Sequence, residues 1–309
     1  MNETLAILRI VLPVLAVLLL GYLSRKKGLL SAEQVGGLKT FVVTFTLPAV
    51  MFSALYRIEY TWDMLLVALT IYAVCIAGYA AGRLVARFTG VGNGLLPFLT
   101  TGFEAGMMGY ALYSMIFGAE HLSSMATVSL GGDLFVFTLY MALLKRENGL
   151  PMRSTVRETL RSPVFLALTA GVIVGATGLG ARLFETAAGG VLQTVLDYLG
   201  APTSCAILFV VGYGIEPSGA ALKAAVKTGG VRLAVMAVLC AVALGVCSLL
   251  PTTDRYRLWA VVLLFTLPGP FVLPVFVRGA ENERFASTCL SLYTILSVAL
   301  FCVVAAVAS

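Results

Sequence analysis

The stretch TGFEAGMMGYALY, from Thr101 to Tyr113, lies inside a segment of the chain that is otherwise long and apolar. It carries one carboxylate, Glu104, and three glycines, Gly102, Gly106 and Gly109. Each glycine weakens a helix interior by about 1 kcal/mol relative to alanine. The stretch therefore allows, without forcing, a helix that opens in its middle, with these three glycines as the helix-breaking residues.

A second interruption, TLPGPFVLP, runs from Thr266 to Pro274. Proline lacks the amide donor of a helix and clashes with the preceding turn. Pro268 and Pro270 are therefore expected to break this second apolar segment.

The composition places both segments in a membrane. Hydrophobic residues make up 60% of the 309 residues and charged residues 12%, whereas a soluble domain carries about 25% charged residues. A bilayer-spanning helix needs about 20 apolar residues. The chain is therefore predicted to be an all-α integral membrane protein, with the lipid bilayer as a partner and no nucleic acid.

Apolar runs separated by polar connections predict ten spans, at 5–23, 34–56, 62–87, 94–118, 122–144, 162–180, 189–214, 229–250, 257–278 and 285–308. Sixteen of the 21 basic residues, Arg232 among them, fall in the connections after odd-numbered spans; the other five are Arg9, Arg57, Arg182, Arg255 and Arg257. Basic loops stay in the cytoplasm, so both termini are expected outside.

The longest basic connection, 145–161, divides the chain into a first half, 1–144, and a second half, 162–309. Each half has five predicted spans, and since five is odd, the halves enter the membrane from opposite sides. The two interruptions occupy corresponding positions, spans 4 and 9. Paired interruptions in inverted halves mark the binding site of many transporters.

If the two breaks cross, their helix amino ends would attract an anion and their carbonyl ends a cation. Hydroxyls at helical spacing in span 10 would add polar groups on one face, with packing between helices as the alternative role. The candidate substrate- or ion-binding residues are Glu104, Asp133, Gly106, Thr266, Pro268, Gly269, Pro270, Ser287, Ser291 and Thr294.

Glu104 has two interpretations. Acids inside a membrane often mark ion pathways, and burial favours the neutral form of a carboxyl group, so Glu104 is expected to carry a proton or to bind a cation. The alternative is a structural acid that stays neutral. Asp133, in span 5, would share a proton or hold Na⁺ with Glu104, or else bond a neighbouring hydroxyl.

The chain resembles the auxin efflux carrier family, which includes bacterial malate and malonate permeases and plant PIN auxin transporters. The resemblance covers all ten spans. It is carried by TLPAVMFSAL, TGFEAGMMGYALY, SLGGDLFVFTLY, LGAPTSCAILFVVGYGI, TLPGPFVLPVFVRGAENERFAST and STCLSLYTILS.

The resemblance implies two inverted five-helix repeats, similar to bile acid–sodium symporters, with helices 4 and 9 broken and crossing. It implies a scaffold of spans 1, 2, 6 and 7 that often forms a homodimer. Spans 3–5 and 8–10 would form a mobile core that moves like an elevator. Relatives commonly carry asparagine near the positions of Glu104 and Asp133, so this chain has two additional acids.

The leading expectation is a secondary active transporter of small organic carboxylates in the bacterial cytoplasmic membrane, coupled to H⁺ or Na⁺. Two charged carboxylates would repel such a substrate, so one is protonated, a cation lies between them, or the substrate is not a simple anion. The alternatives are a sodium/proton or sodium/solute carrier of the same fold with a non-anionic substrate, and a ligand sensor.

An enzyme is not expected. The sequence has no G-x-S-x-G nucleophile turn and no phosphate-binding loop. The six cysteines form no CxxC pair, and His121 is the sole histidine, which argues against a zinc site. No cofactor is expected beyond H⁺ or Na⁺.

Overall fold

The computed structural model describes residues 2–56, 60–89, 94–118, 121–149, 157, 160–215, 219–250 and 254–308, and the regular elements in these residues are all helices. Three five-residue segments, labelled η, are π-helical. In chain order the elements are α1 (Asn2–Lys26), α2 (Ala32–Phe41), η1 (Val42–Thr46), α3 (Leu47–Tyr56), α4 (Trp62–Thr89), α5 (Leu96–Leu99), η2 (Ala105–Gly109), α6 (Tyr110–Phe117), α7 (Leu122–Phe135), η4 (Val136–Tyr140), α8 (Met141–Glu147), α10 (Pro163–Ala176), α11 (Leu179–Phe184), α12 (Ala187–Gly200), α13 (Thr203–Gly214), α14 (Gly219–Ser248), α15 (Arg255–Thr266), α16 (Leu273–Phe276) and α17 (Ala280–Ala308).

Within the described residues, six segments are long and apolar enough to cross a membrane: Ala32–Tyr56, Trp62–Thr89, Leu122–Glu147, Ala187–Gly214, Leu222–Ser248 and Ala280–Ala308. Helix α10 is a shorter apolar helix, and predicted spans 4 and 9 are each divided into shorter pieces. The all-helical membrane architecture is therefore confirmed, whereas the arrangement as ten spans in two inverted repeats stays a prediction.

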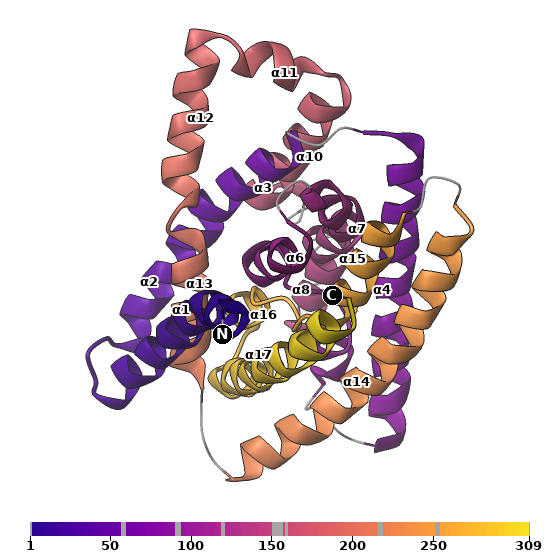
Figure 1. The fold of residues 1–309 in the computed structure, drawn as a ribbon. Helices are drawn as coiled ribbons and strands as arrows, with labels where there is room; N and C mark the ends of the chain where they lie inside the picture. Colours follow the sequence, from indigo (N-terminus) through magenta and orange to yellow (C-terminus); the bar gives the residue numbers. More distant parts are fainter. Residues whose placement is uncertain are drawn as a thin grey trace.

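The helices pack in two groups (Figure 1). In the first group, α1 lies against α13, and α3 lies against α10 and α12. In the second group, α4 packs on α7 and α14, while α15 packs on α7, α14 and α17. In Figure 1 the first helix group lies toward the left and top of the view, and the second helix group lies toward the right and bottom.

Glycine allows the helices inside each group to approach closely. A side chain at Gly212 of α13 would overlap the backbone of Leu18 in α1, and one at Gly171 of α10 would lie 3.0 Å from the backbone oxygen of Phe52 in α3. In the second helix group, Gly131 of α7 abuts the backbone of Ala68 in α4. Such backbone contacts are typical of packing between membrane helices, and they tie together the members of each group.

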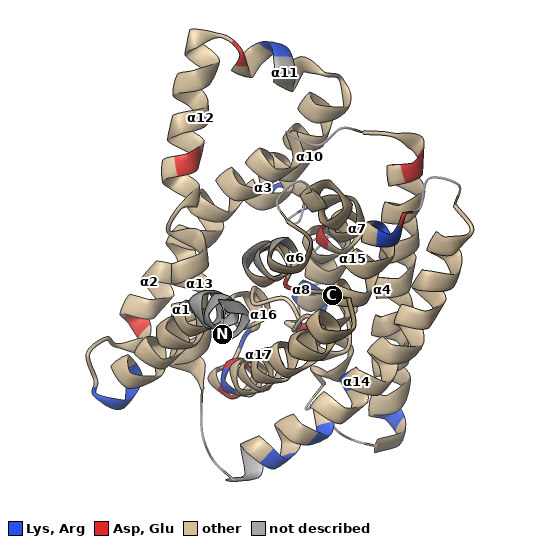
Figure 2. Cartoon of the chain, viewed as in Figure 1, with Lys and Arg blue, Asp and Glu red and all other residues tan. Residues whose placement is uncertain are grey.

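Basic residues gather at one edge of the molecule, at the bottom of Figure 2, around the end of α4, the start of α14 and the turn after α1. The last turns of α1, α4 and α8 carry Arg25, Lys26, Arg87, Lys145 and Arg146. This edge matches the side that the sequence assigns to the cytoplasm.

The placement of Arg232 among the cytoplasmic loop residues is wrong. Helix α14 begins at Gly219, ten residues before the predicted span, so Arg232 lies well inside the helix. Its side chain is only 4% exposed. Without Arg232, fifteen of the remaining twenty basic residues lie in the odd-numbered connections, so the bias that supported the topology persists.

Candidate functional site

The first interruption opens earlier than the sequence suggested. Helix α5 ends at Leu99, residues 100–104 are not helical, and helical structure resumes at Ala105 with η2. Gly102 lies in this break with a φ of 70°, a conformation that favours glycine. A side chain there would also lie 2.7 Å from Cγ of Pro270.

Gly106 and Gly109 therefore do not break the helix, because both lie within η2, which continues into α6. Their identification as breaking residues is wrong, since a single residue with positive φ is sufficient to open the helix at Gly102. Gly109 instead permits close packing: a side chain there would lie 2.8 Å from both Leu267 and Met125.

The second interruption follows α15, which ends at Thr266. Residues 267–272 are not helical, and they include Pro268, Gly269 and Pro270, as the sequence predicts. The four-residue helix α16 follows, and it leads through residues 277–279 into α17. The two interrupted segments differ in shape, because the short piece precedes the break in one and follows it in the other.

The two breaks bind each other directly through Glu104. Its backbone N–H donates to the carbonyl oxygen of Pro268 at 3.0 Å. Its side-chain Oε2 accepts a hydrogen bond from the N–H of Phe271 at 2.9 Å. Glu104 is 9% exposed. One acidic residue thus satisfies a donor and an acceptor that the second break leaves without helical partners.

Arg232 of α14 holds the carbonyl side of the same crossing. Its Nη1 donates to the carbonyl oxygen of Leu99 at 2.9 Å. Its Nη2 donates to those of Gly102 at 3.0 Å and Leu267 at 3.1 Å. The guanidinium therefore bonds backbone from both breaks, and it lies over the ring of Tyr293 with 5.6 Å between Cζ and the ring centroid.

Hydroxyl groups fasten the first break and the end of α5 to α4 and η4. Thr100 Oγ1 donates to the carbonyl oxygen of Gly78 at 3.2 Å, and Thr101 Oγ1 donates to that of Cys75 at 2.5 Å. The Tyr140 hydroxyl donates to the carbonyl oxygen of Phe98 at 3.3 Å. These bonds fix the position from which Glu104 projects.

A cavity of about 820 Å³ lies beside the crossing, between the two helix groups. Its volume is in the range of sites that bind small molecules. It is lined from the first helix group by α3 and α13, and from the second mainly by η2, α6, α7 and η4. The lining residues are Leu47, Val50, Met51, Ala54, Thr61, Met64, Phe103, Glu104, Ala105, Gly106, Tyr110, Ser123, Ser124, Ala126, Thr127, Asp133, Val136, Phe137, Thr203, Ser204, Ile207, Arg257, Pro270 and Val272.

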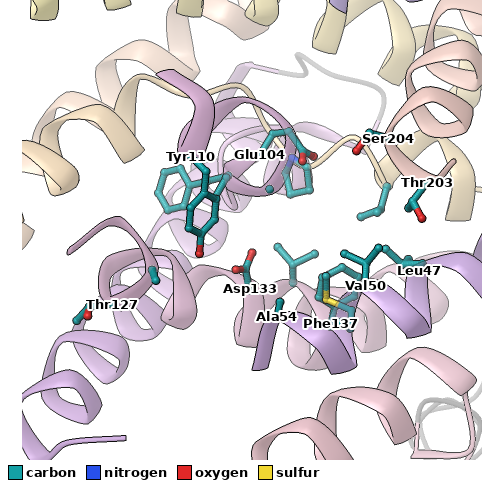
Figure 3. Close-up of a pocket in the computed structure, with 18 of the residues that line it drawn as sticks. Leu47, Val50, Ala54, Glu104, Tyr110, Thr127, Asp133, Phe137, Thr203 and Ser204 are labelled. Carbon is teal, nitrogen blue, oxygen red and sulfur yellow. The ribbon is translucent and has the colours of Figure 1, made fainter. Parts of the chain in front are cut away.

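The polar groups of the cavity lie at different heights along its wall (Figure 3). Asp133 and Tyr110 lie near each other on one side, and Thr203 and Ser204 lie at the other end of the view. The hydroxyl of Tyr110 pairs with that of Ser129 at 2.9 Å. Thr203 Oγ1 is buried and has no hydrogen-bond partner among the described residues.

Glu104 and Asp133 are close enough to interact electrostatically. Arg257, the basic residue among the lining side chains, contributes positive charge near the start of α15. Within the described part of the chain, no group of three or more His, Cys, Asp or Glu side chains could hold a metal ion. The arrangement can accept a proton or a single cation at two carboxyl groups and bind a small polar solute.

Comparison with known proteins agrees with this architecture. Residues 6–307 match the family described as membrane transport protein. The chain belongs to this family. The resemblance to the auxin efflux carriers is thereby confirmed. A relative in Methanothermobacter thermautotrophicus, named an uncharacterized transporter, is 26% identical over 299 residues, covering 93% of this chain and 94% of the relative.

Four of the ten predicted binding residues line the cavity of this membrane transport protein: Glu104, Asp133, Gly106 and Pro270. Pro268 and Gly269 lie in the adjoining break, and the Thr266 hydroxyl bonds the carbonyl oxygen of Leu263 within its own helix. The span 10 residues Ser287, Ser291 and Thr294 are not part of the lining. Ser287 instead packs on Gly214 of α13, so its helix face meets the first helix group.

Several residues of the site were not predicted, among them Tyr110, Thr203 and Arg232. Tyr110 is the tyrosine closest in sequence to Glu104 and lies in the same quoted stretch, TGFEAGMMGYALY. Thr203 lies in a quoted family segment, LGAPTSCAILF, but no spacing rule connects it to span 4. Arg232 follows Gly229 and Gly230 at the start of an apolar run, where an arginine ordinarily marks the cytoplasmic end of a span, so the sequence carries no signal of its burial.

Proposed function

We propose that the protein is a secondary active transporter of small organic carboxylates that couples their movement to a cation, H⁺ or Na⁺. The observation that carries this proposal is the cavity beside the crossed breaks, with Glu104 and Asp133 in its wall. Membership of a membrane transport family supports the transport of a solute. The identity of that solute is inferred from the lining groups.

The lining can accommodate a carboxylate when the two acids are neutral or share a cation. Ala105 and Gly106 begin the helical segment that continues into α6, and the amide groups at a helix start favour negative charge. Thr203, Ser204 and Arg257 add hydrogen-bond donors to the same cavity. Apolar side chains of α3 and η4 complete a pocket suited to a short carbon chain.

Glu104 and Asp133 are the proposed coupling site. Among the other side chains that line the cavity, Tyr110 of α6 and Arg257 of α15 carry charge or a titratable proton. Protonation of one acid would remove the repulsion between the pair and between the pair and an anionic substrate. Substrate and proton would then bind together, which is the requirement for symport.

The proposed movement is an elevator-type exchange between two orientations of the second helix group against the first. The cavity is lined by Thr61, Ser123 and Ser124, near the starts of α4 and α7, away from the basic edge. At the basic edge, Lys39 of α2 forms an ion pair with Glu283 of α17 at 2.7 Å. This geometry fits a state that is open to the outside and closed toward the cytoplasm. We propose that the protein lies in the bacterial cytoplasmic membrane with both termini outside, and that it forms a homodimer through the first helix group.

One observation favours a second candidate, a solute that is not a simple anion. Glu104 already accepts the Phe271 N–H, which is an amide at which a substrate carboxylate would otherwise bind. A solute with an ammonium group would instead find two carboxyl groups in the wall. The second candidate is therefore a cation-bearing solute carried by the same cavity.

The two candidates are separated by a thermal-shift panel on the purified protein. Mono- and dicarboxylates, auxin-like acids, amino acids and simple amines are each tested at pH 5.5 and 7.5, with Na⁺ or choline. A ligand that binds only the folded state raises the melting temperature. Shifts confined to carboxylates and larger at the lower pH support the first candidate, and shifts confined to ammonium compounds support the second. Uptake of the stabilising compound into proteoliposomes then tests transport itself, and a protein that binds but moves no solute would be a sensor.

A further inference from the structure

The crossing has a cationic side chain at its carbonyl side. Arg232 lies in the middle of α14, and two of its nitrogens bond carbonyl oxygens of Leu99, Gly102 and Leu267 at 2.9, 3.0 and 3.1 Å. Leu99 is the last residue of α5, and Leu267 follows the end of α15. One side chain therefore reaches the ends of both helices that stop at the crossing.

Carbonyl groups at helix ends carry partial negative charge and lack helical partners. When such ends meet inside a membrane, they need partners from the protein, a bound cation or water, because the lipid offers none. Backbone oxygens grouped in this way are ligands that alkali cations accept in transporters with broken helices. The three oxygens held by Arg232 are such a group, contributed by two separate breaks.

Arginine is well suited to remain there permanently. Its guanidinium stays charged under all ordinary conditions and directs several N–H groups in a fixed plane. The side chain is 4% exposed, and the aromatic ring of Tyr293 lies against its charge at 5.6 Å. A carboxylate partner within 4.0 Å is not found for it among the described residues, so its charge is directed at the backbone oxygens.

We propose that Arg232 is the resident cation of the crossing: its guanidinium takes the position that a bound metal cation would need on the carbonyl oxygens of both breaks. Arg232 is thus a positioning residue that keeps the two breaks together and holds Glu104 at the cavity. Because the oxygens are already occupied, Na⁺ has no place on them in the wild-type protein.

This inference has a consequence for coupling that rests on the proposed transport function. A cation that drives transport must bind and leave in each cycle, which a side chain of the protein cannot do. The coupling cation must then bind elsewhere, at Glu104 and Asp133, and the carbonyl oxygens of Leu99, Gly102 and Leu267 contribute nothing to Na⁺ dependence.

The test compares the purified full-length wild type with Arg232→Met, Arg232→Lys and the matched control Lys227→Met. Lys227 lies on the same helix and is exposed, so its variant removes one positive charge without touching the crossing. Melting temperatures are measured in choline chloride and after replacement of choline by Na⁺, K⁺ or low millimolar guanidinium at constant ionic strength.

Arg232→Met is expected to melt roughly 5 °C or more below the wild type in choline, because the three oxygens lose a buried charged partner. Guanidinium or a small alkali cation should restore part of this loss in a saturable manner. The wild type and Lys227→Met should show no such response. Arg232→Lys should melt between the wild type and Arg232→Met, since it keeps the charge but not the planar fork.

Three results would overturn the inference. One is a response of Arg232→Met to the cations that equals the response of the wild type. The second is an Arg232→Lys variant that melts no higher than Arg232→Met. The third applies if Arg232→Met does not fold. It is an Arg232→Lys variant that melts as high as the wild type, which would show that the three-oxygen contact is dispensable. Failure of all proteoliposome uptake would count against the proposed transport function and leave these melting results unaffected.

Discussion

The carboxylate of Glu104 accepts a hydrogen bond from the backbone N–H of Phe271 at 2.9 Å, so the acid of one interrupted helix caps the other. The same residue donates its own N–H to Pro268 and lines the cavity. The structural role and the proposed ion-binding role therefore fall on one side chain, and substitutions must be chosen to separate them.

Glu104→Gln should separate the two roles. The amide oxygen can still accept from Phe271, so the melting temperature should fall by no more than the equivalent of about 1 kcal/mol. The titratable proton is lost, so uptake should lose its dependence on pH. Glu104→Leu should also leave the Phe271 N–H unpaired, at about 1–3 kcal/mol. Uptake into proteoliposomes between pH 5.5 and 8, and thermal unfolding, measure the two effects. Glu185→Gln, an exposed acid, is the control, and an unchanged pH profile in Glu104→Gln would refute the coupling role.

Asp133 and Glu104 should act as a pair. Because both line one cavity and interact electrostatically, neutralising one acid changes the environment of the other. The double variant Glu104→Gln/Asp133→Asn should therefore show a loss of uptake smaller than the sum of the two single losses in free-energy terms, with a difference of about 0.5–3 kcal/mol. A double-mutant cycle on initial uptake rates measures this coupling. Strict additivity would mean that the two acids work independently.

Gly102→Ala should destabilise the protein more than its backbone angle alone explains. A residue with a side chain costs about 1–2 kcal/mol at positive φ, and the Cβ would lie 2.7 Å from Pro270, which adds about 1–3 kcal/mol of overpacking. Gly28→Ala is the matched control, because Gly28 has a φ of 63° and nothing within 4 Å of its Cβ position. Thermal unfolding of the two variants should give the larger loss for Gly102→Ala, and equal losses would contradict the close contact between the breaks.

Lys39 and Glu283 join the two helix groups at the basic edge, with 2.7 Å between the charged atoms. Lys39 Nζ also donates to the carbonyl oxygen of Pro274 at 3.4 Å. Both side chains are partly exposed, so the ion pair contributes about 1 kcal/mol at most. Lys39→Glu should weaken closure on this side. The measurement uses a protein that lacks the six native cysteines and carries a cysteine in place of Ser287. Labelling of this cysteine by a membrane-impermeant thiol reagent, applied to the cytoplasmic face, should rise in Lys39→Glu.

The charge swap Lys39→Glu/Glu283→Lys is the control for that experiment. It restores opposite charges, so labelling should return toward the level of the parent protein. Labelling that stays high in the swap, or never rises in Lys39→Glu, would mean that this ion pair does not control access.

The sequence was sufficient to locate the parts of the site whose chemistry is unusual for a membrane segment. Glu104, Pro268 and Pro270 stand out in apolar runs, and the structure places all three at the crossing. Asp133 was found for the same reason. Helical spacing grouped Ser287 and Ser291 on one face, but spacing cannot say which neighbour a face meets, and Ser287 meets Gly214 of α13 rather than the cavity.

Arg232 shows a different limit of prediction from the sequence. Counting basic residues assumes that an arginine near the end of an apolar run lies in a loop. Helix α14 starts at Gly219, within a polar stretch that contains Lys223 and Lys227, so hydropathy alone could not reveal that the helix extends so far. The partners of Arg232 are carbonyl oxygens, and backbone oxygens leave no trace in a sequence.

The glycine contacts within each helix group imply that substitutions inside a group and substitutions between the groups have different effects, which a genetic screen can detect. Gly212 against Leu18, and Gly131 against Ala68, join helices of the same group at backbone distance. A larger residue at either position should reduce the amount of protein that accumulates in the membrane. Residues that line the boundary between the groups, such as Val50 and Ile207, face open space, so their substitution should leave abundance intact and alter the speed or selectivity of the carrier. A screen that scores abundance and growth separately would then identify the residues at the boundary of the helix group that is proposed to move.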